Sequence, residues 1–123
     1  MIRGGGLYPA IWLEIVHERE RLHQSLTLDD LNRAKRDWPW PVAAMFAGAI
    51  TPDQVIAEAA RSPRSPTSDH RCEADFYITE WDLTHGGQDV TRTGFEQALR
   101  ECPPTFDEAS MARLELARTD KTP

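Results

Sequence analysis

Two consecutive helices in the C-terminal half of the chain most constrain its fold. Ser68 or Asp69 is suited to cap a helix that Gly86-Gly87 ends. Asp89 is suited to cap a second helix, which ends before Pro103-Pro104 because a residue that precedes proline disfavours the helical conformation. Helices joined by a short connection pack antiparallel. These residues therefore predict a helical hairpin.

The same kind of signal recurs along the rest of the chain, and strand signals are nearly absent. The sequence has no run of alternating β-branched residues and no Asn-Gly or Asp-Gly hairpin turn. We therefore predict an all-α fold with a single helical domain, flanked by a flexible N-terminus and a short tail. The expected parts are a leader at 1–7, the domain at 8–118 with helix pairs at about 8–37, 41–61 and 70–102 and a capping helix at 106–118, and a tail at 119–123.

Helix ends in the first half follow from local signals. Apolar spacing predicts a first helix from Tyr8 to Leu22 and a second from Leu28 to Asp37, with Thr27 as a possible cap. The segment 38–41, Trp-Pro-Trp-Pro, ends the second helix. A proline-rich ligand for a partner domain is one interpretation of this segment. We favour a turn that places both tryptophans in the core.

Two capping boxes and one glycine are further local predictions. Thr51 with Gln54, and Thr105 with Glu108, have the spacing at which a cap and the third helical residue each bond the other's backbone. Gly94 lies in the middle of a helix, where glycine costs roughly 1 kcal/mol relative to alanine. We interpret Gly94 as a point of close packing.

The charge of the chain excludes two classes of partner. Its 123 residues include 14 basic and 20 acidic ones, a net charge of −6. Nucleic acids and anionic membranes both select clustered basic surfaces, so we expect neither as a partner. No apolar run reaches the roughly 20 residues of a membrane-spanning helix, and the start carries no export signal. We expect a cytoplasmic protein, or a periplasmic one if the start is truncated and the two cysteines are oxidised.

A repeat relates the two halves of the chain. Trp38-Pro39 and Cys102-Pro103 stand 64 positions apart, and the same offset pairs Trp12 with Phe76. This offset is close to two helix-pair units of roughly 34 residues each. The chain is therefore predicted to contain a matching unit in each half, with a shorter one between them.

Residues 72–103 resemble a tetratricopeptide repeat. The matches are to the family's first-helix leucine and to the aromatic, small and terminal proline positions of its second helix, here Ile78, Phe95, Ala98 and Pro103. The departures fall where the family prefers tryptophan, a small residue, tyrosine and alanine, here Asp75, Thr79, Asp82 and Thr91. Most of the chain also looks like the C-terminal part of bacterial tetratricopeptide proteins. This resemblance implies helix hairpins stacked as a short α-α superhelix.

The resemblance also implies a concave face built from first-helix side chains. The residues at these positions are Trp12, Val16, Arg19, Glu73, Phe76, Glu80, Leu83 and Thr84. This mixture of acidic and aromatic side chains suits a basic or amphipathic peptide. We therefore expect a non-catalytic scaffold that binds a protein or peptide. The alternative is a self-associating structural unit, a homodimer or a fragment of a longer repeat array.

The two cysteines lie at the start of one predicted helix and at the end of its partner. In an antiparallel hairpin these ends meet, so Cys72 and Cys102 are candidates for a disulfide. Two buried thiols that act as small apolar residues are the alternative. A zinc site would need further ligands, and His17, Glu20 and His23 do not share one helix face. We expect no metal, no cofactor and no catalytic centre.

Overall fold

A computed structural model describes residues 7–22 and 24–120. The fold is all-helical, with seven helices and no strand in those residues. The chain divides into two compact units, unit 1 (residues 1–58) and unit 2 (residues 59–123), where the sequence predicted a single domain over 8–118. Each unit is described below by itself. The stacking of hairpins into a superhelix stays a prediction.

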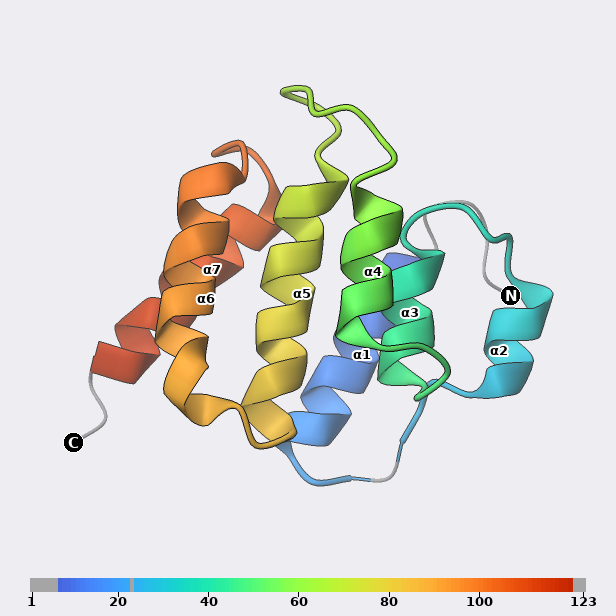
Figure 1. The fold of residues 1–123 in the computed structure, drawn as a ribbon. Helices are drawn as coiled ribbons and strands as arrows, with labels where there is room; N and C mark the ends of the chain where they lie inside the picture. The colour runs from blue at the N-terminus through green and yellow to red at the C-terminus, as the bar shows by residue number, and fades with distance from the viewer. Residues whose placement is uncertain (1–6, 23, 121–123) are drawn as a thin grey trace. The chain divides into compact units, whose positions relative to one another are not determined.

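Unit 1 contains α1 (Leu7–Arg19), α2 (Leu28–Arg33), α3 (Trp40–Phe46) and most of α4 (Pro52–Ala59) (Figure 1). α3 packs against both α1 and α2. It is buried along its length, from Pro41 to Phe46. α3 is therefore the central helix of unit 1.

The first two helices are shorter than predicted. α1 ends at Arg19 because Arg21 takes the left-handed conformation, with φ 58°, and the chain turns back there. α2 ends at Arg33 because Ala34 is extended. The predicted ends, Leu22 and Asp37, both lie outside helices.

The segment between α1 and α2 is held by one buried carboxylate. Glu14 is 1% exposed, and its Oε1 accepts hydrogen bonds from Ser25 N at 2.8 Å, Ser25 Oγ at 3.0 Å and Leu26 N at 2.8 Å. Three hydrogen bonds to one buried oxygen fix the return of the chain toward α2.

The predicted caps of α2 and α4 are confirmed. Thr27 forms a full capping box with Asp30. The Thr51 backbone N–H donates to Gln54 Oε1 at 2.8 Å, and Gln54 N donates to Thr51 Oγ1 at 3.3 Å. Each box satisfies donors that the first helical turn leaves unbonded.

Unit 2 contains α5 (His70–Thr84), α6 (Gln88–Glu101) and α7 (Asp107–Asp120). α5 and α6 lie side by side and antiparallel, and α7 packs on α6 and touches α5 (Figure 1). Asp69 caps α5 as predicted, because its side chain accepts a hydrogen bond from Cys72 N. The helix is followed by Gly86, whose φ of 97° suits glycine.

Two predicted caps in unit 2 are wrong. α6 begins at Gln88 after Gly87, with no side-chain cap, so Asp89 lies inside its first turn. α7 begins at Asp107, two residues after Thr105, and Glu108 bonds elsewhere. In both cases the short connection sets the helix start, and it overrides the local capping preference.

The predicted close contact at Gly94 is confirmed. A Cβ atom placed there would lie 2.3 Å from Thr79 Oγ1 and 2.8 Å from Thr79 Cγ2. Thr79 is 5% exposed and donates a 2.7 Å hydrogen bond to Asp75 O. Only glycine therefore lets α6 approach the threonine of α5 this closely.

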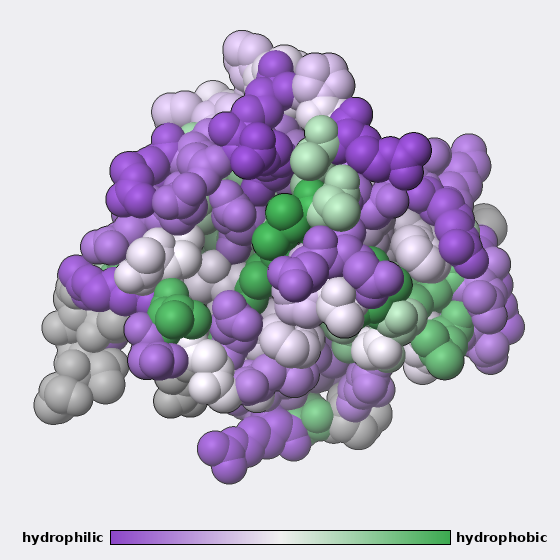
Figure 2. Space-filling view, in the orientation of Figure 1, coloured by the Kyte–Doolittle hydropathy of each residue, from purple (hydrophilic) through white to green (hydrophobic). Residues whose placement is uncertain are grey.

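Hydrophilic side chains cover most of the face shown in Figure 2, and hydrophobic ones form small separate patches. The most exposed large hydrophobic residues are Leu13, Val16, Leu22, Leu28, Ile56, Val90 and Leu114. No helix among the described residues carries more than two of them. None of these helices is both long enough and apolar enough to cross a bilayer.

Candidate functional site

The α5 side chains predicted to line a concave binding face are mostly inaccessible. Phe76 is fully buried, and Glu73 and Glu80 are only 7% and 2% exposed. Leu83 is half-buried, and Thr84 is exposed. A buried side chain gives a partner no surface to contact. Glu73, Phe76 and Glu80 therefore do not form an open peptide-binding face in this structure.

Phe76 is buried because it belongs to an aromatic cluster of α5 and α6. Its ring centroid lies 5.1 Å from that of Tyr77 in a T-shaped arrangement, and 5.9 Å from that of Phe95. Such contacts stabilise aromatic pairs beyond the area that they bury. The aromatic residue that the repeat pattern assigned to binding thus stabilises the hairpin.

The α1 residues of the predicted face belong to unit 1. Trp12 and Arg19 are half-buried, and Val16 is 49% exposed beside the equally exposed Leu13. The α5 residues of the same predicted face belong to unit 2. A groove shared by both sets stays a prediction, as does self-association through the apolar side of α1.

Cys72 and Cys102 form a disulfide, with their Cα atoms 4.9 Å apart. The bridge joins the first turn of α5 to the residue that follows α6. Both cysteines are buried, and they pack with Ala109 and Phe106. The sequence left open a disulfide or two buried thiols, and the structure contains the disulfide.

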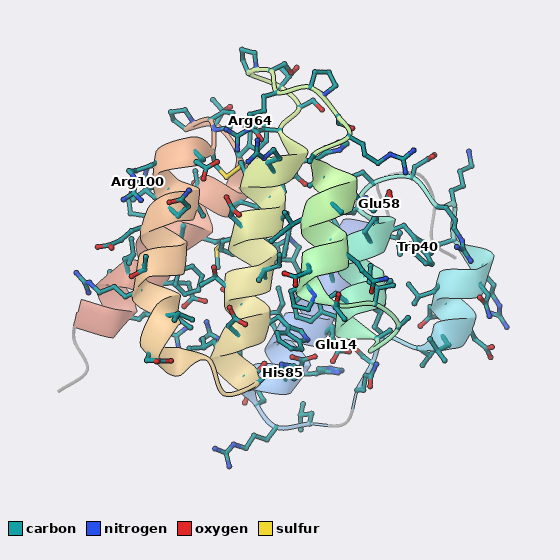
Figure 3. The ribbon with its side chains drawn as sticks, viewed as in Figure 1. Glu14, Trp40, Glu58, Arg64, His85 and Arg100 are labelled. Atoms are coloured by element: carbon teal, nitrogen blue, oxygen red, sulfur yellow. A yellow bond between two sulfur atoms is a disulfide. The ribbon has the colours of Figure 1, made fainter. Side chains whose placement is uncertain are left out.

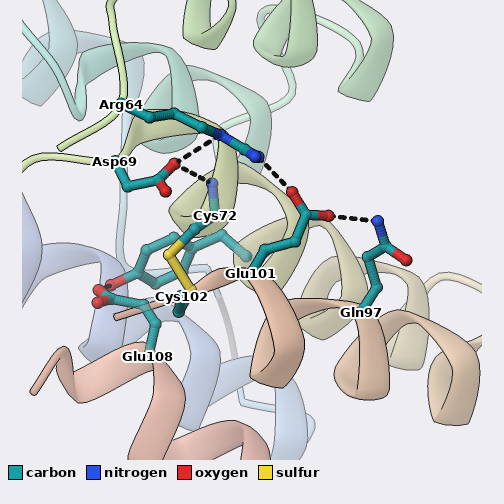
Figure 4. Close-up of a disulfide and its surroundings, with 8 residues drawn as sticks. Arg64, Asp69, Cys72, Gln97, Glu101, Cys102 and Glu108 are labelled. Atoms are coloured by element: carbon teal, nitrogen blue, oxygen red, sulfur yellow. Dashed lines mark hydrogen bonds and ion pairs between the residues drawn. A yellow bond between two sulfur atoms is a disulfide. The ribbon is translucent and has the colours of Figure 1, made fainter. Parts of the chain in front are cut away.

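Arg64 lies beside this disulfide and connects the loop before α5 to both helices of the hairpin (Figure 4). Its Nε is 3.3 Å from Asp69 Oδ1, the same oxygen that caps Cys72 N at 3.0 Å. Its guanidinium also donates to Glu101, which accepts a second hydrogen bond from Gln97. A single cation therefore holds the loop at the bridged end of the hairpin.

Asp75 completes this cluster from the next turn of α5. Burial and a hydrogen bond with Glu101 raise the pKa of Asp75 from 3.8 to about 7, against the nearby charges of Arg64 and Arg71. Although burial opposes it, hydrogen bonds from Arg64, Asp75 and Gln97 hold the pKa of Glu101 below its ordinary value. The two carboxyl groups thus titrate as a pair that shares one proton, and Asp75 has the higher pKa of the two.

The shared proton predicts that the stability of unit 2 falls as the pH rises from about 4 to about 7. Folded Asp75 binds a proton in this range and unfolded Asp75, with a pKa near 3.8, does not, so deprotonation favours unfolding. Asn at position 75 keeps a neutral donor to Glu101, so Asp75→Asn is expected to flatten this dependence. Urea unfolding followed by circular dichroism between pH 5 and 8 measures it.

Asp89→Asn is the matched control for Asp75→Asn, because Asp89 is exposed in the first turn of α6. It is expected to retain the decline between pH 5 and 8. A wild-type protein whose unfolding midpoint is constant over this range would show that Asp75 and Glu101 do not share a proton.

A second buried acid joins α5 to α7. The Tyr77 hydroxyl donates a 2.6 Å hydrogen bond to Glu108 Oε2. Burial raises the pKa of Glu108, and the nearby charge of Glu73 adds to the effect, against the bond from Tyr77. Shifted carboxyl pKa values occur both at catalytic sites and in structural networks. Asp75 and Glu108 each bond across to another helix of unit 2, so we interpret both as structural.

A groove in unit 1, among the described residues, is a candidate for a binding site. It has a volume of about 390 Å³, within the range of small-ligand sites. Its walls come from the segment after α2, from the start of α3, from the turn before α4 and from one side of α4. They are formed by Arg36, Trp40, Pro41, Ile50, Gln54, Ala57 and Glu58.

Trp40 forms a fixed wall of this groove (Figure 3). Its indole Nε1 donates to Leu31 O at 3.1 Å, which sets the orientation of the ring. The guanidinium carbon of Arg36 lies 4.4 Å from the ring centroid, in a cation–π contact. The sequence placed both Trp38 and Trp40 in the core, whereas the structure leaves both half-buried.

Other candidate chemistry is sparse in the described residues. They contain no group of three or more histidine, cysteine or carboxylate side chains placed to hold a metal ion. His23, one of the residues weighed as a ligand, lies outside the described residues. His85 stacks on Trp81 with ring centroids 4.1 Å apart, and its Nδ1 is 2.8 Å from Trp81 O. These contacts place His85 in the C-terminal cap of α5.

Comparison with known proteins adds no assignment. No protein-family model, no curated protein and no solved structure matches this chain. The resemblance of residues 72–103 to a tetratricopeptide repeat therefore stays a prediction.

Proposed function

We propose that this protein is a non-catalytic helical module that binds a peptide segment of a partner protein in the groove of unit 1. The observation that carries the proposal is the groove itself, where Trp40 offers a fixed aromatic wall and Arg36 a stacked cation. Aromatic and arginine side chains dominate the binding energy of protein interfaces. The repeat-like sequence led us to expect the same class of function on α5, whose predicted face is largely buried.

The composition of the groove suits a short segment of chain. Trp40, Ile50 and Ala57 supply apolar contact, and Gln54 and Glu58 supply polar groups on α4. Ligand sites usually combine an apolar lining with a few polar groups that orient the ligand. A volume of about 390 Å³ accommodates a few side chains of an extended peptide.

Filling the groove is expected to abolish peptide binding. Ala57 is exposed on α4 and lines the groove, so Ala57→Trp occupies its volume without disturbing the core. Octapeptides selected from a random library displayed on phage against the wild-type protein should bind the variant at least tenfold more weakly. Fluorescence anisotropy of the synthetic peptides measures the difference.

Ile56→Trp is the matched control. Ile56 is 44% exposed on the same helix and does not line the groove, so this variant is expected to bind as the wild type does. Failure to select any peptide, or equal binding by the wild type and Ala57→Trp, would refute the proposed function.

A further inference from the structure

The arrangement of Arg36 restricts what the groove accepts. Arg36 lies in the exposed segment between α2 and α3, and its guanidinium stacks on the face of Trp40. The hydrogen bond from Trp40 to Leu31 O fixes the orientation of that ring, and the guanidinium carbon of Arg36 lies 4.4 Å from its centroid. A guanidinium above an aromatic ring still has N–H donors with which it can bind a ligand.

No carboxylate in the described part of the chain forms an ion pair with Arg36. Glu58 lines the same groove and has an interaction of its own. By contrast, Arg64 in unit 2 bonds two carboxylates. Arg36 is thus a cation beside an apolar surface, and the planar donor set of a guanidinium matches a carboxylate.

We propose that the groove binds a peptide segment in which one aspartate or glutamate side chain, received by Arg36, adjoins an apolar residue that packs on Trp40 and Ala57. This inference rests on the proposed function and names the ligand of the same site. The groove is partly open to solvent. Glu58 and the net charge of −6 oppose a run of acidic residues, which favours a single carboxylate.

The test is a double-mutant cycle between the protein and a selected peptide. The probe is the tightest-binding octapeptide from the phage selection, synthesised with blocked ends. Replacing its acidic residue by the matching amide is expected to weaken binding to the wild-type protein about tenfold. In Arg36→Ala the acidic and amide peptides should bind equally, because the group that distinguishes them is absent.

Arg33→Ala is the control, since Arg33 is exposed at the end of α2 and does not line the groove. It should preserve the tenfold preference for the acidic peptide. A third peptide, with the amide side chain and a free C-terminal carboxylate, tests whether Arg36 binds the carboxylate of a chain end in place of a side-chain carboxylate. Tighter binding of this peptide than of the blocked acidic one would assign the groove to chain ends and overturn the proposal.

The outcomes separate the inference from the function on which it rests. If Ala57→Trp abolishes binding but Arg36→Ala keeps the preference for the acidic peptide, the groove binds peptides without a carboxylate contact and this inference is wrong. If selected peptides carry no acidic residue, the inference is also wrong and the proposed function stands. Peptides that bind Ala57→Trp as well as the wild type refute both.

Discussion

Reducing the Cys72–Cys102 disulfide is expected to lower the free energy of unfolding of unit 2 by about 3.5 kcal/mol. The bridge closes a loop with a sequence separation of 30. A crosslink of this span lowers the conformational entropy of the unfolded chain, which raises the free energy of that state by about 3.5 kcal/mol. The cost is large because typical domains are stable by only about 5–15 kcal/mol. Hydrogen exchange of α5 and α6, with and without reductant, measures the change locally.

The double variant Cys72→Ala, Cys102→Ala separates the crosslink from the packing of its sulfur atoms. It is expected to be less stable than the reduced wild type, because both cysteines are buried and alanine leaves their volume unfilled. Reductant should have no effect on this variant. Equal exchange of α5 in the oxidised and reduced wild type would show that the bridge does not stabilise the hairpin.

The second large effect is expected at the contact between Gly94 and Thr79. Gly94→Ala places a methyl group 2.3 Å from Thr79 Oγ1, and rotating the threonine away breaks its hydrogen bond to Asp75 O. Overpacking of this kind costs about 1–3 kcal/mol, against a gain of about 1 kcal/mol in helix propensity. We expect a net loss of up to about 2 kcal/mol in the free energy of unfolding, measured by urea unfolding.

The loss should become smaller when the threonine is absent. Thr79→Ala removes the two nearest atoms, Oγ1 and Cγ2, and leaves only the Cβ atom of residue 79 at 3.1 Å, so Gly94→Ala is expected to destabilise this background less than the wild type. Thr93→Ala, at an exposed neighbouring position of α6, reports propensity without the contact. If Gly94→Ala is equally destabilising with and without Thr79, a clash with the Thr79 side chain is not the cause of the loss of stability.

Local signals predicted much of the fold of this protein. The Thr51 box, the Asp69 cap and the close approach at Gly94 each depend on residues that are near in sequence or on a single steric requirement. The predictions that failed are those in which the capping preference of a residue competes with the constraint of a short connection between helices. Asp89 and Thr105 are suitable caps by residue type, but the short connections place the helix starts elsewhere.

The candidate sites were much less predictable, because they depend on contacts between distant residues. Arg64 reaches Glu101 across 37 positions, and no pattern in the low-complexity loop around it indicates this partner. Arg36 and Trp40 are close in sequence, but the groove also needs Ala57 and Glu58 from α4. The repeat pattern placed binding residues on α5, and burial within the fold removed three of them from the surface.

The position of the disulfide also determines how this chain responds to mechanical tension. A pull applied from residue 59 to residue 120 passes through the Cys72–Cys102 bond, because the bridge joins the two ends of the α5–α6 hairpin. The enclosed residues bear no load and do not extend. Oxidised unit 2 therefore lengthens by roughly 100 Å less than the reduced chain when it is drawn out, at about 3.3–3.6 Å per residue. The bridge makes this hairpin an inextensible element within an otherwise extensible chain.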